Sequence, residues 1–93
     1  MIFSFRCAAT AKVYQGDKVP DFPADIQKVA LRKLQQLDLA IRLDDLRVPP
    51  GNRLESLKGN RASQHSIRIN DKYRLCFEWS DHDVRNVEIV DYH

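Results

Sequence analysis

Two runs of alternating residues, HSIRIN at positions 65–70 and YRLCFEW at positions 73–79, decide the fold of this chain. In each run every second residue is apolar, which is the period of a β-strand with one buried face. The Asn-Asp pair between the runs is a turn signal, so the two runs predict an antiparallel hairpin. Since side chains two positions apart share a face of a sheet, Arg68 and Arg74 are expected to come together on the face away from the core.

Further strands are expected on both sides of this hairpin. Residues 85–91 return as the last strand, and residues 53–57 provide a short strand before the hairpin. Together these segments indicate an antiparallel β-meander in the second half of the chain. Residues 2–6 are rich in β-forming side chains and predict one more strand at the start.

A long amphipathic helix is expected from Pro23 to Ala40 or Ile41. Pro23 suits the first helical turn, and Asp25 suits the positive end of the helix dipole. Apolar side chains recur in steps of three and four and form one stripe: Ile26, Ala30, Leu34, Leu37 and Ile41. This stripe is predicted to pack on the apolar face of the sheet. The opposite face mixes glutamines with cations, a composition that does not favour binding to a membrane surface.

The remaining elements are short. Residues 8–15 predict a second helix that ends near Gly16, and residues 43–46 add a helical turn before the break at residues 49–52. The fold class predicted from all of these elements is α+β. An N-terminal strand and two helices would pack on one face of a mainly antiparallel, twisted sheet.

Length and composition limit the kind of protein this can be. Its 93 residues allow one domain, spanning residues 1–93, and 43% hydrophobic with 30% charged residues is typical of a globular chain. The net charge of +2 is spread evenly, because residues 1–46 carry seven cations and six anions while residues 47–93 carry eight and seven. Any contact with nucleic acid must therefore come from a local cluster. Neither a signal peptide nor an apolar run of about 20 residues is recognisable, so a cytoplasmic protein is expected.

The two paired arginines are the first candidates for chemistry. Guanidinium groups on one face repel each other unless an anion lies between them, and phosphate oxygens match their geometry. The alternative is equally open on spacing alone. In it, each arginine pairs with a surface carboxylate such as Glu78 or Glu55.

Lys58 and His93 are weaker candidates when taken singly. Lys58 precedes Gly59, and a glycine there lets backbone amides approach an anion, although a plain surface lysine fits the pattern as well. His93 carries an imidazole, a group that ordinarily titrates at about pH 6.5 and can transfer protons. A terminal histidine, however, often belongs only to a frayed chain end. Metal binding is not favoured, because the three histidines lack ligand spacing and the two cysteines form no CxxC pair.

Four segments in order give these candidates a common context. They are PPGNRLESLKGNR at 49–61, QHSIRIN at 64–70, YRLCFEW at 73–79 and VEIVDYH at 87–93. Together they resemble HigB-type toxins, the plasmid-maintenance "killer" branch of the RelE/ParE superfamily. The resemblance extends over the whole chain, and the order of the pieces makes it specific.

The resemblance implies a small RelE-like fold and a toxin of a type II toxin–antitoxin module. Such toxins are ribosome-dependent endoribonucleases that cleave mRNA in the ribosomal A site without a metal or other cofactor. The positions that match the family's active site are Lys58, Arg68, Arg74, Tyr92 and His93, with Asp91 beside them.

Roles for these residues follow from the chemistry that the resemblance implies. The ribose 2′-OH attacks the adjacent phosphate, which requires a base, an acid and cations. His93 is expected to be the main proton-transfer group, and both arginines to stabilise charge because a guanidinium is a poor acid. Lys58 would hold the phosphate or share proton transfer, and Tyr92 would orient a base or stack on it.

The resemblance also implies partners. These are a HigA-type helix-turn-helix antitoxin, the 70S ribosome with its mRNA, and operator DNA only through the antitoxin complex, in which the toxin acts as co-repressor. No membrane partner is expected. The main alternative is a ParE-like inhibitor of DNA gyrase without enzymatic activity. A third is a relative that has lost toxicity and acts mainly in a transcriptional complex.

Overall fold

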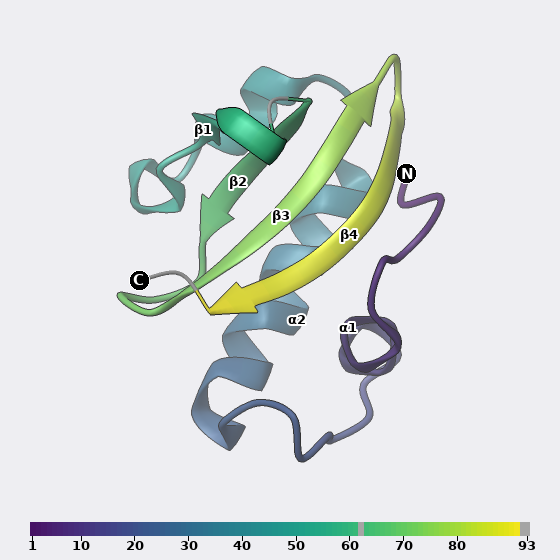
Figure 1. Ribbon diagram of the computed structural model, residues 1–93, viewed down its shortest axis with the longest axis vertical. Helices are drawn as coiled ribbons and strands as arrows, with labels where there is room; N and C mark the ends of the chain where they lie inside the picture. Colours follow the sequence, from purple (N-terminus) through teal and green to yellow (C-terminus); the bar gives the residue numbers. More distant parts are fainter. Residues whose placement is uncertain (62, 92–93) are drawn as a thin grey trace.

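A four-stranded antiparallel sheet forms the centre of the molecule (Figure 1). The computed structural model describes residues 1–61 and 63–91. The strands are β1 (Glu55–Ser56), β2 (Gln64–Arg68), β3 (Tyr73–Ser80) and β4 (Asp83–Asp91), and each pairs with the next in chain order. The predicted meander is therefore confirmed. Its first strand is shorter than the expected residues 53–57.

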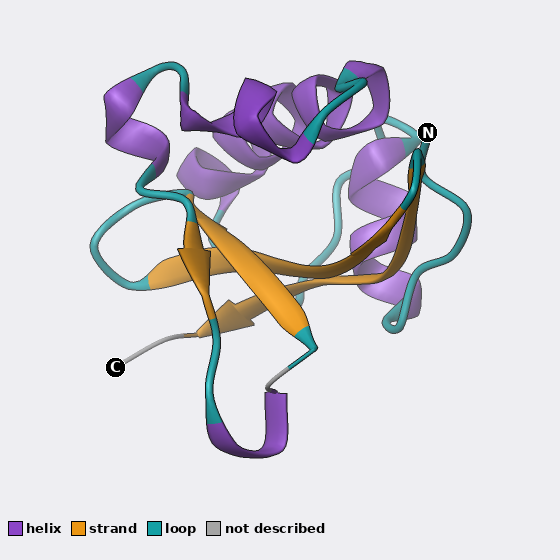
Figure 2. Ribbon diagram, turned by 90° about the horizontal axis from the view of Figure 1, so that it is seen from above, coloured by secondary structure: helices purple, strands orange, loops and turns teal. Residues whose placement is uncertain are grey.

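Two helices cover one face of this sheet. They are α1 (Ala8–Tyr14) and α2 (Ala24–Leu39). Figure 2 shows α2 lying across the sheet, with α1 at the side of the molecule where the N-terminus lies. Three 3₁₀ turns complete the structure: η1 (Leu43–Arg47), η2 (Pro50–Asn52) and η3 (Gly59–Arg61). Turn η3 projects on the side opposite α2 (Figure 2). The predicted α+β class is confirmed.

The core lies between α2 and the sheet. Leu34 and Leu37 of α2 are fully buried, as are Leu75 and Phe77 of β3. The predicted stripe is wrong at Ile41, whose side chain is 67% exposed. The helix ends at Leu39 and Ala40 is extended, so Ile41 leaves the helical period.

The N-terminal segment runs beside β4 in the parallel direction. It forms two isolated bridges, Ile2 with Val84 and Phe5 with Val87, in place of the continuous strand expected over residues 2–6. Next to it, the buried hydroxyl of Thr10 accepts a hydrogen bond from Ile89 N (3.0 Å), which joins α1 to β4. In the described part of the chain, no helix is long and apolar enough to cross a bilayer.

Candidate active site

The sheet face opposite α2 carries the two predicted arginines. Arg68 ends β2, and it lies directly opposite Arg74 of β3 in the strand register. This pairing confirms the expectation that the two side chains share a face. On the other side of β3, Arg74 pairs with Val90 of β4.

The guanidinium group of Arg74 is held from two sides. Its Nε donates to Ser66 Oγ (2.9 Å), and its Nη2 donates to the backbone carbonyl of Arg53 (2.8 Å). Glu55 lies next to it, with Oε2 at 3.7 Å from Nη2. Glu55 is thus one of the two carboxylates considered as alternatives, while Glu78 accepts a hydrogen bond from Asn86 (2.9 Å). The side chain of Arg74 is only 9% exposed, so its orientation is fixed within the protein.

Arg68 lies in a more open environment. It forms an ion pair with Asp71 in the β2–β3 turn, and the Asp71 side chain is 96% exposed. Exposed ion pairs contribute little to stability. Loss of this ion pair would therefore cost the folded protein little stability.

Lys58 is exposed and lies between β1 and η3. It lines a hollow of about 380 Å³ together with Glu55, Ser56, Leu57 and Arg61. Glu55 also contacts Arg74, so this carboxylate connects the hollow with the arginine pair.

The C-terminal candidates are only partly described. Asp91 ends β4 opposite Tyr73, the residue before Arg74, and its carboxylate lies 3.7 Å from Lys72 Nζ. Tyr92 and His93, the proposed base-binding and proton-transfer groups, lie outside the described residues.

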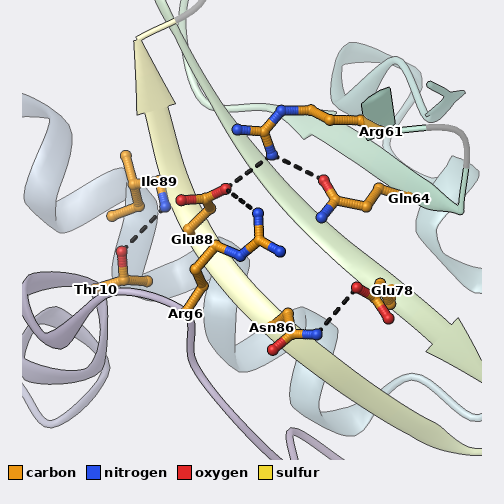
Figure 3. Close-up of polar contacts among 8 residues, drawn as sticks. All are labelled: Arg6, Thr10, Arg61, Gln64, Glu78, Asn86, Glu88 and Ile89. Carbon is orange, nitrogen blue, oxygen red and sulfur yellow. Dashed lines mark hydrogen bonds and ion pairs between the residues drawn. The ribbon is translucent and has the colours of Figure 1, made fainter. Parts of the chain in front are cut away.

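A network of charged groups on the same face was missed in the sequence. Arg61 Nη1 donates to Glu88 Oε1 and to Gln64 Oε1, both at 2.8 Å, and Arg6 Nη1 lies 3.7 Å from Glu88 Oε1 (Figure 3). The bond to Glu88 raises the pKa of the Arg61 guanidinium. These contacts hold η3 against β2 and β4. The only sign of this network in the sequence was Glu88, a charged residue in the middle of the alternating strand predicted for residues 85–91.

A buried polar cluster behind η2 was also missed. The Asn52 side chain is fully buried; its Nδ2 donates to Leu46 O and to Gln36 Oε1, both at 3.1 Å, and its Oδ1 accepts from Lys33 Nζ. Burial lowers the pKa of Lys33, and the charges of Arg32 and Arg68 lower it further. Asn52 follows Pro-Pro-Gly, which signalled only a loop.

Two other features lie apart from the predicted site residues. An apolar hollow of about 460 Å³ between α1, the following loop and α2 is lined in part by Val13, Phe22 and Leu31. Of the predicted site residues that the structure describes, none lines it. Within residues 1–61 and 63–91, no three potential metal ligands of the His, Cys, Asp or Glu type come together.

Comparisons with known proteins give one consistent result. Residues 3–93 match the family described as the RelE-like toxin of type II toxin–antitoxin system HigB. Toxin HigB-1 of Vibrio cholerae is 43% identical over 82 residues, which are 87% of this chain and 86% of that protein. An uncharacterized protein of Haemophilus influenzae is 36% identical over 84 residues, covering 89% of this chain and 83% of that one.

A solved structure has the same fold. It is the YoeB–YefM complex from Staphylococcus aureus, with a TM-score of 0.58 over 100% of this chain and 98% of the matched chain. The sequence identity is 18%, so this likeness concerns the fold alone.

Proposed function

Because the chain belongs to the HigB family of RelE-like toxins of type II toxin–antitoxin systems, we propose that it is a ribosome-dependent endoribonuclease. It cuts mRNA in the ribosomal A site without a metal, and translation stops. The observation that carries this proposal is the direct pairing of Arg68 with Arg74 on the sheet face opposite α2, called the open face below. Arg74 also pairs with β4, the strand whose sequence continues into Tyr92 and His93.

The reaction is an internal attack of the ribose 2′-OH on the adjacent phosphate. Arg74 stabilises the negative charge that develops on the phosphorane oxygens, because its guanidinium is already oriented by two neutral oxygens. Arg68 releases its ion pair with Asp71 and binds the phosphate in its place. Lys58, on the exposed chain before η3, contacts the same phosphate or shares proton transfer.

The proton-transfer step is assigned to the end of the chain. His93 exchanges protons with the 2′-OH and the leaving 5′-oxygen, since imidazole is the side chain best matched to neutral pH. Tyr92 orients or stacks on a base, and Asp91 supports the two residues that follow it. Removal of Arg74 should reduce the cleavage rate by about 10²–10³, equivalent to about 3–4 kcal/mol.

The proposed protein partner is a helix-turn-helix antitoxin of the HigA type. It neutralises the toxin, and the complex represses the shared promoter by binding operator DNA through the antitoxin. Family membership supports a cognate antitoxin.

Induction of the chain in bacteria, followed by primer extension on an abundant mRNA, tests this function. Cuts within translated codons are expected for the wild type and for His82→Ala, a control histidine exposed in the β3–β4 turn. The same cuts should be absent for His93→Ala. Full cleavage by His93→Ala would contradict the proton-transfer assignment.

Two other outcomes would redirect the assignment. Growth arrest with DNA breaks and intact mRNA would favour a gyrase inhibitor of the ParE type. Absence of any arrest would favour the relative that has lost toxicity and acts only in transcriptional control.

A further inference from the structure

The backbone at Arg53 adopts an unusual conformation next to the candidate site. Its φ is +47°, in the left-handed region that costs a non-glycine residue about 1 kcal/mol or more. Such conformations persist where the surrounding structure holds them, and they concentrate at functional sites. The carbonyl of this residue is the one that accepts the hydrogen bond from Arg74 Nη2 (2.8 Å).

The residue before it is the most firmly anchored polar group of the loop. Asn52 is fully buried, and its amide is satisfied on both sides, by the carbonyl of Leu46 (3.1 Å), by Gln36 of α2 (3.1 Å) and by Lys33 of α2. Lys33 is itself only 9% exposed. Breaking a buried network of this kind leaves unsatisfied donors and acceptors, which is costly.

Backbone contacts transmit this anchoring to the carbonyl. The N–H of Asn52 donates to Pro49 O (2.9 Å), and the N–H of Arg53 donates to Pro50 O (3.1 Å). One peptide unit therefore separates a side chain fixed to α2 from the oxygen that orients Arg74.

We propose that Asn52 is a positioning residue for Arg74, and that it acts through the backbone carbonyl of Arg53. This inference rests on the proposed function, in which Arg74 stabilises the charge of the transition state. Arg53 O and Ser66 Oγ are neutral acceptors, so they fix the plane of the guanidinium without cancelling its charge. Glu55, at 3.7 Å and with a side chain that is 51% exposed, is a more distant and more exposed neighbour.

The first test measures the orientation of Arg74 directly, without catalysis. In the free toxin, NMR would follow the Arg74 Nη2–H signal, which comes from the donor to Arg53 O, in wild type, Asn52→Ala and Ile26→Ala. Ile26 is a buried residue at the start of α2 and serves as a control for general destabilisation. Asn52→Ala should shift this signal and speed its exchange with water by about tenfold, because the Arg53 carbonyl no longer holds the guanidinium. Ile26→Ala should leave the signal unchanged.

The second test measures single-turnover cleavage on mRNA-programmed ribosomes. Asn52→Ala should reduce the cleavage rate by about 10- to 100-fold, as expected for a misplaced catalytic group, and change ribosome affinity by less than about twofold. In an Arg74→Ala background, Asn52→Ala should cause no further loss, because a residue that acts only through Arg74 has nothing left to position.

The outcomes separate this inference from the function on which it rests. If the wild type does not cut mRNA, the proposed function fails, while the NMR signal still decides whether Asn52 orients Arg74. An unchanged signal in Asn52→Ala, or a rate loss that adds fully to that of Arg74→Ala, would overturn the inference.

A milder variant covers the case in which Asn52→Ala does not fold. Gln36→Ala removes one of the acceptors of the Asn52 amide, from a part-buried position on α2, and leaves the carbonyls of Leu46 and Val48 in place. It should displace the Arg74 signal in the same direction by a smaller amount. No displacement in this folded variant would equally overturn the inference.

Discussion

The two arginines of the candidate site differ in how readily a phosphate can reach them. The side chain of Arg74 is 9% exposed and bonded to fixed oxygens, whereas Arg68 is 33% exposed and its partner Asp71 is almost fully exposed. A buried guanidinium with fixed partners is preorganised for charge that develops during a reaction. An exposed one is suited to the capture of an anion. In the proposed reaction, Arg68 is therefore suited to the first contact with the phosphate, and Arg74 is suited to the chemical step.

His65 gives a prediction about pH. Burial lowers its pKa, so as the pH falls the unfolded chain takes up a proton before the folded protein does. The stability linked to His65 is therefore complete above about pH 6.5 and is lost as the pH falls through the lowered folded-state pKa. His65→Gln should show a smaller loss of unfolding free energy than the wild type between about pH 7.5 and about pH 5.

Urea denaturation of both proteins at these two pH values measures the difference. His82→Gln serves as a control, because this histidine is exposed in the β3–β4 turn, where its ring lies 3.1 Å from the carbonyl of Ile41, and its substitution removes no buried imidazole. Equal pH dependence in the wild type and His65→Gln would contradict the role assigned to burial.

At the scale of elements, α2 provides the largest test of packing. Leu34 is fully buried against the sheet, whereas Leu39 in the last turn of the same helix is 78% exposed. Leu34→Ala should lower the unfolding free energy by about 2–5 kcal/mol, because it removes apolar contacts and leaves a cavity. Leu39→Ala should change it by less than about 0.5 kcal/mol. Thermal unfolding followed by circular dichroism distinguishes the two, and similar losses for both variants would contradict this orientation of the helix.

The ion pair between Arg61 and Glu88 is one of the contacts that attach η3 to the sheet. Arg61 Nη1 donates to Glu88 at 2.8 Å, and hydrogen bonds to charged groups contribute about 1.5–3 kcal/mol. Glu88→Gln should therefore increase amide hydrogen exchange in residues 57–61, the segment that carries Lys58. Glu78→Gln is the matched control, because Glu78 is on the same face but bonds to Asn86. Equal exchange in the wild type and Glu88→Gln would show that η3 is held by other contacts.

The elements were more predictable from the sequence than the contacts of the site. Strand and helix positions follow from local periodicity, which also placed Arg68 and Arg74 on one face. The partners of Arg74 depend on the path of the chain between α2 and β2, since one of them is the carbonyl of Arg53. Backbone carbonyls have no sequence signal, and the anchoring amide of Asn52 lies within a segment that reads only as a turn.

For the whole molecule, the proposed function requires that a net charge of only +2 suffices to bind RNA. The cations of the open face are few and local: Lys58, Arg61, Arg68 and Arg74. About four phosphate contacts give a logarithmic salt slope of about −2.8 to −3.6, so ribosome affinity should fall about 50- to 150-fold between about 50 and 200 mM KCl.

Binding to ribosomes over a series of salt concentrations measures this slope. Arg68→Ala should reduce its magnitude by about one. Arg85→Ala is the control, because Arg85 stacks on Phe3 (4.1 Å to the ring centroid) and lies near the opposite end of β4 from Asp91. An equal reduction by both variants would indicate that binding depends on general charge and not on this face.

The short N-terminal bridges also affect how readily the sheet edges can pair with another copy of the protein. Phe3 and Arg6 donate backbone hydrogen bonds to β4, and Val84 and Val87 donate back to Met1 and Ser4, so the outer edge of that strand is occupied over residues 84–87. At the other edge of the described sheet, β1 is only two residues long. An open strand edge is a template on which copies of a protein polymerise. With one edge partly covered and the other very short, the described part of the sheet offers little continuous edge on which a second copy of the protein could pair.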